Sequence, residues 1–428
     1  MPDLRRDPIV GRWVIIATER ARRPSDHAPA PVPTPGGLCP FCPGHEDKTP
    51  REVYASGRPH HAPADSPGWK VRVVPNRFPA LKIEGDLDRQ ADGIYDRMNG
   101  IGAHEVIIET AQHERSMKDL SDAELAEVLY AMKARVLDLR NDLRFRYILL
   151  FKNHGRLAGA SLDHSHSQLI ALPVVPRHVI EEIDGARRHH ELKERCIFCD
   201  IVSQERKDRV RLVHENDEFV VFAPYAPRSP FETWIVPRHH ASSFEAEPRE
   251  RLAYCAQALG TTLRRLAAAL GDPDYNFIVH TNPLRDAASP SYHWHVEVMP
   301  SLTQVAGFEW GSGFHINPVP PEEAAEFLRK VPGSSLARPA VPRVLAPGRA
   351  RGQALGEWRF FSSPPRWPPG PRRGASATWR PRYLARLPSA ATPSRWSRHG
   401  TDRSTRRGTG STPSTGRCGC VERRPRSG

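Results

Sequence analysis

The chain has 428 residues, of which 39% are hydrophobic, and a formal net charge of +13. Residues 333–428 hold 20 of the 62 basic residues and only three of the 49 acidic ones, so residues 1–332 keep 42 basic and 46 acidic side chains. Because nucleic-acid binding needs a basic surface, this nearly neutral body argues against nucleic acid as a partner. No apolar run reaches the ~18 residues of a membrane span, and the N-terminus lacks the apolar core of a signal peptide, so we expect a cytoplasmic protein without a membrane partner.

The first chemical signal along the chain is a pair of cysteines, Cys39 and Cys42, separated by two residues. This spacing lets one turn present two sulfurs to one ion, and in a reducing compartment it indicates a metal site before a disulfide. Zinc prefers four tetrahedral ligands, often two cysteines and two histidines. His113, which follows the apolar run 106–108, and His164 are available to complete the set. The sequence therefore predicts a zinc site formed by these four side chains.

A helix and a strand are predicted between those two histidines. Ser121, with Glu124 three residues later, forms a capping box typical of a helix N-terminus. Apolar residues at helical spacing follow it and predict one buried face: Leu125, Val128, Leu129, Met132, Val136 and Leu139. The run 147–151 then predicts a strand.

His166 lies two residues beyond His164 and is predicted to serve a different purpose. On a strand, residues two apart point to the same face, so one histidine can bind metal while the other faces a pocket. The loop 153–161 contains glycines that let backbone N–H groups approach a phosphate, and Ser161 adds a hydroxyl donor. Gln168 falls on the same face again. Since histidine can carry a transferred group covalently, the segment predicts a nucleophile beside a phosphate-binding loop.

The second half of the body repeats this order of elements. An apolar run at 234–236 leads to two histidines, a helical pattern covers 252–266, and a strand pattern covers 276–279. The spacing from His113 to His164 is 51 residues, and the spacing of the corresponding pair is 53. The repeat predicts an α+β fold of two similar units, 1–185 and 186–332, each an antiparallel sheet with a packed helix. It also predicts a second zinc site formed by Cys196, Cys199, His240 and His293.

The sequence leaves three alternatives open. His239 and His295 compete with the chosen histidines as ligands of the second site. A zinc ribbon would place its ligand pairs within a few tens of residues, so a structural clamp inside a larger fold agrees better with the spacing. Residues 333–428 are rich in Pro, Gly, Ser and Arg. Such a composition cannot bury a core, so we expect a disordered tail or a non-native one.

Four segments of the chain resemble the galactose-1-phosphate uridylyltransferase family of the histidine-triad superfamily: residues 5–16, 20–24, 74–81 and 151–168. The resemblance implies that His166 attacks the α-phosphorus of a nucleotide sugar, keeps the nucleotidyl group and passes it to a second sugar 1-phosphate. It also implies a homodimer. The residues that it implies for substrate binding are Arg20, Arg23, Asn76, Phe78, Asn153, Gly159, Ser161, Gly311 and Gly313.

Gln168 would hydrogen-bond the transferred phosphoryl oxygens, as the resemblance implies. Hydrolases of the superfamily carry histidine at this position, so glutamine favours transfer over hydrolysis. Ser165 stands where many members have proline, a change expected to alter loop stiffness rather than chemistry.

The second Cys-x2-Cys pair sets the chain apart from the best-known members, which bind another metal there through Glu and His. With this pair and the segment 307–318, which contains Gly311 and Gly313, the chain is similar to a branch that includes enzymes acting on ADP-glucose with phosphate as acceptor. The prediction is a UDP-glucose:galactose-1-phosphate uridylyltransferase of galactose metabolism that carries one or two zinc ions. An ADP-glucose phosphorylase and a zinc-stabilised nucleotide-binding protein remain the alternatives.

Overall fold

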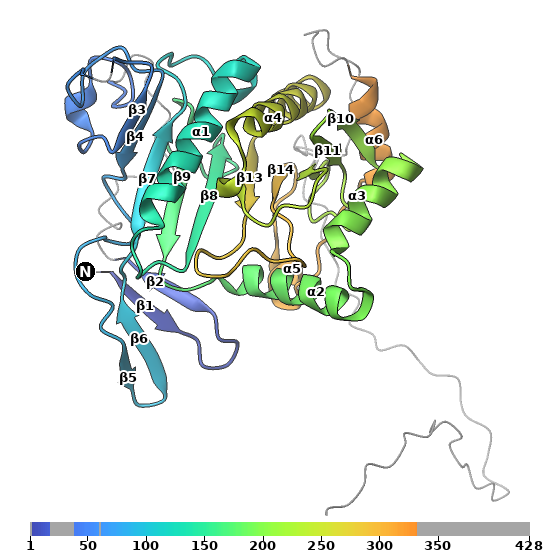
Figure 1. Ribbon diagram of the computed structural model, residues 1–428, viewed down its shortest axis with the longest axis horizontal. Helices are drawn as coiled ribbons and strands as arrows, with labels where there is room; N and C mark the ends of the chain where they lie inside the picture. Colours follow the sequence, from blue (N-terminus) through green and yellow to red (C-terminus); the bar gives the residue numbers. More distant parts are fainter. Residues whose placement is uncertain (1, 18–37, 60, 332–428) are drawn as a thin grey trace, which may run out of the picture. The chain divides into compact units, whose positions relative to one another are not determined.

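The structure, a computed structural model, describes residues 2–17, 38–59 and 61–331. Within these ranges the chain forms a large antiparallel sheet, a small antiparallel sheet and six α-helices (Figure 1). No helix in the described part is long and apolar enough to cross a membrane. Arg20, Arg23 and the tail 333–428 lie outside the described residues.

The large sheet has ten strands and is built from two groups of five. The order across the sheet is β3-β4-β7-β9-β8 followed by β13-β14-β12-β11-β10. The first group consists of β3 (Tyr54–Ser56), β4 (Val71–Pro75), β7 (Ala103–Ile108), β9 (His166–Leu172) and β8 (Tyr147–His154). The second consists of β13 (Tyr275–His280), β14 (His295–Pro300), β12 (Thr233–Pro237), β11 (Phe219–Phe222) and β10 (Leu212–Glu215).

The two groups have the same internal order and meet at their equivalent strands, β8 and β13. These strands pair antiparallel from Tyr275 opposite His154 to Val279 opposite Leu150. The halves are therefore related by an approximate twofold axis between β8 and β13, and their sheets are continuous. The α+β class and the duplicated antiparallel plan are confirmed, and the edge-to-edge junction is what the structure adds.

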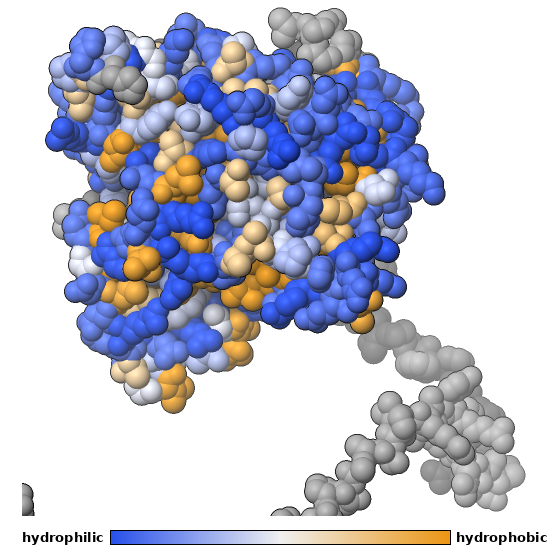
Figure 2. Space-filling view, in the orientation of Figure 1, coloured by the Kyte–Doolittle hydropathy of each residue, from blue (hydrophilic) through white to orange (hydrophobic). Residues whose placement is uncertain are grey.

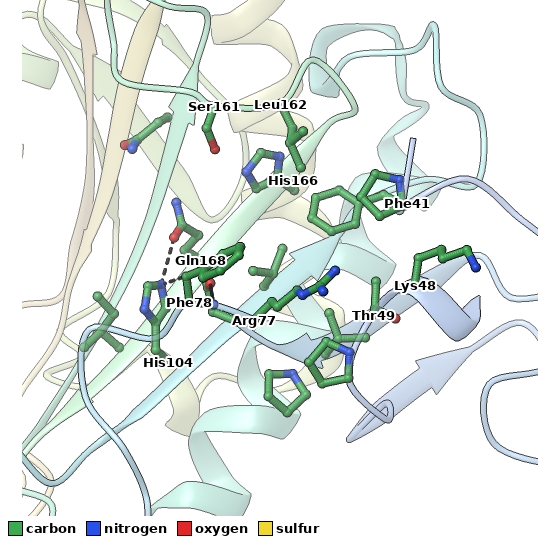
Figure 3. Close-up of a pocket in the computed structure, with 18 of the residues that line it drawn as sticks. Phe41, Lys48, Thr49, Arg77, Phe78, His104, Ser161, Leu162, His166 and Gln168 are labelled. Atoms are coloured by element: carbon green, nitrogen blue, oxygen red, sulfur yellow. Dashed lines mark hydrogen bonds between the residues drawn. The ribbon is translucent and has the colours of Figure 1, made fainter. Parts of the chain in front are cut away.

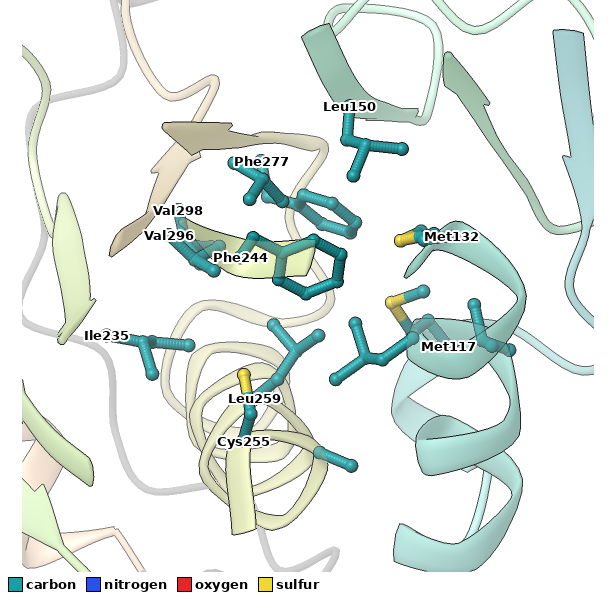
Figure 4. Close-up of a cluster of buried hydrophobic side chains, with 14 of the residues drawn as sticks. Met117, Met132, Leu150, Ile235, Phe244, Cys255, Leu259, Phe277, Val296 and Val298 are labelled. Atoms are coloured by element: carbon teal, nitrogen blue, oxygen red, sulfur yellow. The ribbon is translucent and has the colours of Figure 1, made fainter. Parts of the chain in front are cut away.

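Two long helices cover one face of the large sheet. The first is α1 (Asp122–Leu139) and its counterpart is α4 (Arg249–Leu270), and they pack against each other. The predicted capping box is present, since the Ser121 hydroxyl accepts from the Glu124 N–H and the Glu124 side chain returns to the Ser121 backbone. The apolar faces of both helices and the inward residues of the strands form one core, which includes Met132, Cys255 and Phe277 (Figure 4).

The remaining helices lie around the second half. They are α2 (Arg177–Lys193), α3 (Ile197–Asp208), α5 (Gly307–Ser312) and α6 (Pro321–Lys330). Since α2 runs across residues 185 and 186, the boundary between the two predicted units falls within a helix. Three short 3-10 helices complete the described helical segments: η2 (Glu46–Lys48), η3 (Met117–Asp119) and η4 (Phe244–Ala246).

The small sheet has the strand order β2-β1-β6-β5 and belongs to the first half. Its strands are β2 (Trp13–Ile16), β1 (Asp3–Arg6), β6 (Tyr95–Asn99) and β5 (Gln90–Asp92). Leu4 and Met98 attach it to the large sheet through a buried cluster with Leu81. The turns between its strands expose apolar groups, among them Ile9 and Ile94, and orange side chains are visible in this region in Figure 2.

Candidate active site and metal clusters

The alternation of β9 places two polar side chains on the face of the sheet opposite α1. His166 and Gln168 point to this face, whereas Leu169 and Ala171 join the core beneath α1. The neighbouring strand β7 alternates in the same way, with His104 and Val106 on the open face. The predicted common face of His166 and Gln168 is therefore present.

A pocket of about 410 Å³ lies on this face of the first half (Figure 3). That size falls within the range of about 300–1,000 Å³ found for small-molecule sites. Lys48 and Arg77 line it and give it positive charge suited to phosphate groups. The residues predicted from the sequence that line this pocket are Asn76, Phe78, Asn153, Gly159, Ser161, His166 and Gln168.

The loop between β8 and β9 is held by the second half of the chain. The Leu157 N–H donates to the Asp274 carboxylate at 2.6 Å. Gly155 has a φ of +81°, and a Cβ at this position would meet the same carboxylate at 2.0 Å. Gly159 also has a positive φ, +87°, which non-glycine residues rarely adopt. The local backbone therefore explains both glycines without reference to a ligand, and it presents Ser161 at the pocket.

His166 is positioned with one ring nitrogen occupied and the other open. Its Nδ1 lies 2.8 Å from the His164 carbonyl oxygen, which can only accept, so Nδ1 carries the proton. Nε2 then keeps its lone pair. Burial lowers the pKa of His166 to about 4, and the Lys152 ammonium adds to this effect. The imidazole is therefore neutral near pH 7, which is the form that can act as a nucleophile.

Gln168 contacts a residue that the sequence analysis did not identify, His104. The Gln168 Oε1 atom lies 2.9 Å from His104 Nε2, and Asn76 Nδ2 lies 3.1 Å from the same nitrogen. On the other side of the ring, Nδ1 accepts from the Ala80 N–H at 3.1 Å. The available signal was a histidine in the strand pattern before Val106, at a position that faces the pocket.

A buried ion pair lies behind the histidine segment and was also missed. The Lys152 ammonium is 2.7 Å from the Glu109 carboxylate, and neither side chain is more than 1% exposed. Lys152 also donates to the His166 carbonyl oxygen at 3.0 Å. Glu109 accepts from the hydroxyl of Ser165 at 2.6 Å and from that of Ser167. The segment around His166 is thus fixed from behind by hydrogen bonds.

The first predicted zinc set is brought together next to this segment. The ligand atoms of Cys39, Cys42, His113 and His164 all lie within 4.8 Å of one another. Tetrahedral zinc with ordinary bond lengths separates sulfur and nitrogen ligands by about 3.5 Å. The Cys42 sulfur is 3.4 Å from His113 Nδ1 and 3.7 Å from His164 Nδ1. His164 Nε2 donates to the Thr110 carbonyl at 2.8 Å, which leaves Nδ1 free to bind a metal.

The second predicted zinc set has the same geometry. Cys196, Cys199, His240 and His293 also have ligand atoms within 4.8 Å of one another. The Cys199 sulfur is 3.5 Å from His240 Nδ1 and 3.6 Å from His293 Nδ1. His239, one of the two alternatives, instead contacts Glu247 at 3.0 Å and lies outside this cluster.

A third group of ligand-type side chains was not predicted as a site. Glu182, His280 and His295 have their ligand atoms within 4.8 Å of one another, so His295 lies in this group rather than in the second zinc set. His280 Nδ1 is 2.8 Å from Glu182, and its Nε2 is 3.2 Å from Glu297. Although burial opposes protonation, these two carboxylates raise the pKa of His280 to about 10 when no ion is bound. A proton or a cation can therefore balance the carboxylates here.

Among the predicted substrate-binding residues that the structure describes, Gly311 and Gly313 are the two that it does not bring to the pocket. They lie on α5 and directly after it, in a segment that exposes Trp310 and Phe314. Neither glycine lines the pocket of its own chain.

Comparisons with known proteins agree with this arrangement. Residues 1–176 match the family model described as galactose-1-phosphate uridyl transferase, N-terminal domain, and residues 101–331 match a domain of unknown function (DUF4921). An ADP-glucose phosphorylase of Arabidopsis thaliana is 37% identical over 77% of this chain and 93% of its own. A galactose-1-phosphate uridylyltransferase of Thermotoga maritima is 27% identical over 77% and 98%. The crystal structure of an ADP-glucose phosphorylase from Arabidopsis thaliana with bound ADP-glucose is 36% identical, covers 78% of this chain and 99% of that one, and has a TM-score of 0.62.

Proposed function

Because the chain belongs to the galactose-1-phosphate uridylyltransferase family, we propose that it transfers a nucleoside monophosphate between a nucleotide sugar and a phosphate acceptor through a covalent nucleotidyl-His166 intermediate. The observation that carries the proposal is the state of His166. Its ring is neutral, its Nδ1–H is held by the His164 carbonyl, and it lines a pocket with positive charge at its edge.

The proposed reaction has two displacements at one phosphorus atom. In the first, the Nε2 lone pair of His166 attacks the α-phosphorus, a P–N bond forms, and the P–O bond to the departing sugar 1-phosphate breaks. In the second, a phosphate oxygen of the acceptor attacks the same phosphorus and the P–N bond breaks. Phosphate is a good leaving group, so the protein needs to supply position and charge stabilisation more than acid–base catalysis. Lys48, Arg77 and Gln168 are the pocket side chains proposed for this purpose.

Intact-protein mass spectrometry without an acceptor tests the covalent step. We expect the mass to increase by one nucleoside monophosphate after mixing with the correct nucleotide sugar, and we expect no increase in His166→Ala. UDP-glucose and ADP-glucose are tested separately. If neither donor modifies the zinc-loaded wild-type protein but one of them binds, the chain is a nucleotide-binding protein and the covalent mechanism is wrong.

The donor and acceptor divide the proposal into two candidates. The first candidate pair is UDP-glucose with galactose 1-phosphate, since the family description names galactose 1-phosphate and uridyl transfer. Phosphorolysis of ADP-glucose is the second candidate, and a specific observation favours it: the identity is 37% to an ADP-glucose phosphorylase and 27% to a uridylyltransferase over similar lengths. Adding galactose 1-phosphate or inorganic phosphate to the nucleotidylated protein separates the two, because only the correct acceptor removes the adduct rapidly.

Zinc is the cofactor proposed for both Cys2His2 clusters. The sulfur–nitrogen separations agree with tetrahedral zinc, and burial raises the pKa of the Cys42 thiol to about 11 when no cation is near. A thiolate at this position therefore needs a positive partner. With four protein ligands in each set, bound zinc would cross-link the chain rather than offer an open coordination position.

A homodimer in the cytoplasm completes the proposal. Gly311 and Gly313 are implied substrate-binding residues, yet they lie on an exposed segment outside the pocket of their own chain. A second copy could present this segment to the pocket of the first. Analytical sedimentation compares the wild-type chain with Trp310→Ala, and we expect the variant to dissociate into monomers at a higher protein concentration. We also expect the variant to bind the donor nucleotide sugar more weakly.

A further inference from the structure

We propose that His104 is a positioning residue that holds the Gln168 side-chain amide with its NH2 group toward the transferred phosphoryl group. This inference rests on the proposed nucleotidyl transfer and deepens it. His104 itself does not need to touch the reacting atoms, because its effect passes through Gln168. Figure 3 shows the two side chains side by side in the pocket, joined by a hydrogen bond.

The backbone of Ala80 determines which nitrogen of His104 carries the proton. The Ala80 N–H can only donate, and it points at His104 Nδ1 at 3.1 Å. In a neutral imidazole one nitrogen accepts and the other donates, so Nε2 carries the hydrogen. The opposite tautomer would direct an Nδ1–H at the Ala80 N–H, which is part of the backbone and cannot turn away. The Asn76 NH2 group also faces Nε2, but it belongs to a side chain whose torsions can adjust.

The protonated Nε2 in turn determines the orientation of Gln168. The atom of Gln168 at 2.9 Å from this nitrogen must be an acceptor, and hence the amide oxygen Oε1. Asn76 also approaches Nε2, at 3.1 Å, but through its own NH2 group, because its Oδ1 already accepts from the Phe78 N–H at 2.9 Å. Of these two amides, only Gln168 therefore offers an acceptor to His104. Its NH2 group is directed away from His104.

The orientation decides whether Gln168 attracts or repels a phosphate. An NH2 group donates to the negatively charged phosphoryl oxygens, whereas a reversed amide would present its carbonyl oxygen to them. Glutamine alone has no preference between the two orientations, since a rotation of its terminal torsion exchanges them. A fixed hydrogen-bond donor beside the Gln168 side chain is therefore required to select one orientation of the amide.

The strands make His104 a rigid support. It is 5% exposed and lies on β7, where its backbone pairs with Ile170 of β9, while Gln168 pairs with Val106. His104 and Gln168 are thus diagonal neighbours on adjacent strands of one face.

The test compares the rate of nucleotidylation in single-turnover experiments for four proteins: wild type, His104→Leu, Gln168→Ala and the double variant. Loss of one preorganised donor typically slows catalysis by about 10²–10³-fold, so we expect His104→Leu to be slower by about tenfold or more, with donor binding changed less than the rate. If His104 acts only through Gln168, the double variant will be no slower than Gln168→Ala within about twofold. His104→Gln, which keeps a side-chain donor, should recover part of the rate.

Three results separate the possible failures. A wild-type protein that forms no adduct overturns both the proposed function and this inference. A wild type that forms the adduct together with an unchanged His104→Leu overturns the inference alone. Equal slowing by His104→Leu with and without Gln168 also overturns it, because His104 would then act by another route. His214→Leu is the control, because it removes a partly buried, hydrogen-bonded histidine of the second half that does not line the pocket.

Discussion

The two halves of the molecule place a histidine at the same position and give it opposite surroundings. His166 is the first residue of β9 and His295 is the first residue of β14, the equivalent strand. His166 lines the pocket, and its ring packs edge-on against Phe41 with the two ring centroids 5.4 Å apart. His295 is completely buried, stacked on Trp234 at 4.9 Å and on His280 at 4.7 Å.

The residues around each histidine also differ, since those of the first half are polar, whereas those of the second half are buried and mostly apolar. Two positions beyond them, Gln168 faces the pocket while Glu297 is buried and paired with Arg228. The residues on either side of His166 are Ser165 and Ser167, and both donate hydrogen bonds to Glu109. The residues on either side of His295 are Trp294 and Val296, which join the apolar core. The comparison teaches that the fold supplies a position for a histidine at a strand start, and that the neighbouring side chains decide whether it can react.

Replacing each of the two histidines in turn should give the largest difference in covalent labelling. We expect His166→Ala to lose covalent labelling by at least about 10⁴-fold, because the nucleophile itself is removed. His295→Ala should still be labelled, since its ring does not reach the pocket. Mass spectrometry after a single addition of donor measures both. Labelling that survives in His166→Ala, or that disappears in a folded His295→Ala, would reverse the assignment of the two halves.

The two Cys2His2 clusters should differ in how strongly they affect labelling. Each replacement, Cys42→Ser and Cys199→Ser, should reduce the zinc content by about one ion per chain and lower the thermal midpoint. Only Cys42→Ser should also slow labelling severely, because its cluster includes His164, whose carbonyl holds the His166 ring. Elemental analysis and labelling on the same samples test this. Equal loss of labelling in both variants would show that the clusters act only through overall stability.

The buried ion pair of the first half should be sensitive to single replacement. Glu109→Gln leaves the Lys152 ammonium buried without its carboxylate, and we expect a loss of about 3–5 kcal/mol in the free energy of unfolding. The double variant Glu109→Gln with Lys152→Met should recover much of this loss. Urea unfolding measures it, with Glu127→Gln as the control. Glu127 pairs with Arg249 at a largely exposed site, where a change of about 0–1 kcal/mol is expected.

The pH dependence of labelling should be the smallest effect. Free histidine titrates near pH 6.5, whereas burial lowers the pKa of His166 to about 4. Because a lowered pKa keeps the ring neutral down to that pH, the labelling rate should change by less than about twofold between about pH 8 and pH 6. Zinc content is measured at each pH as the control. A rate that halves near pH 6.5 would show that the pocket does not suppress protonation.

Much of this arrangement could be predicted from residues close together in the sequence. The matching spacings of the paired histidines indicated the duplicated fold, and the Cys-x2-Cys pairs indicated both four-residue clusters. Strand alternation was sufficient to put His166 and Gln168 on one face. Each of these patterns depends on local geometry, which sequence spacing carries directly.

The residues that were missed act across long sequence separations. His104 meets Gln168, and Glu109 meets Lys152, only because β7, β9 and β8 are neighbours in the sheet. The junction of β8 with β13 has the same character, since no local pattern specifies which strand edges will meet. Gly155 has a second cause that the sequence does not show, because the Asp274 carboxylate leaves no room for a Cβ at this position.

The junction of β8 with β13 has a further meaning for how such a molecule can change through evolution. If two identical subunits were joined at this edge, one gene would encode both, and every substitution would be present twice. A wider cavity or a bulky tryptophan would then appear on both sides of the axis. When both copies belong to one polypeptide, each codon is inherited separately. One copy is then free to fill its cleft with aromatic rings and become a scaffold, while the other keeps the chemistry.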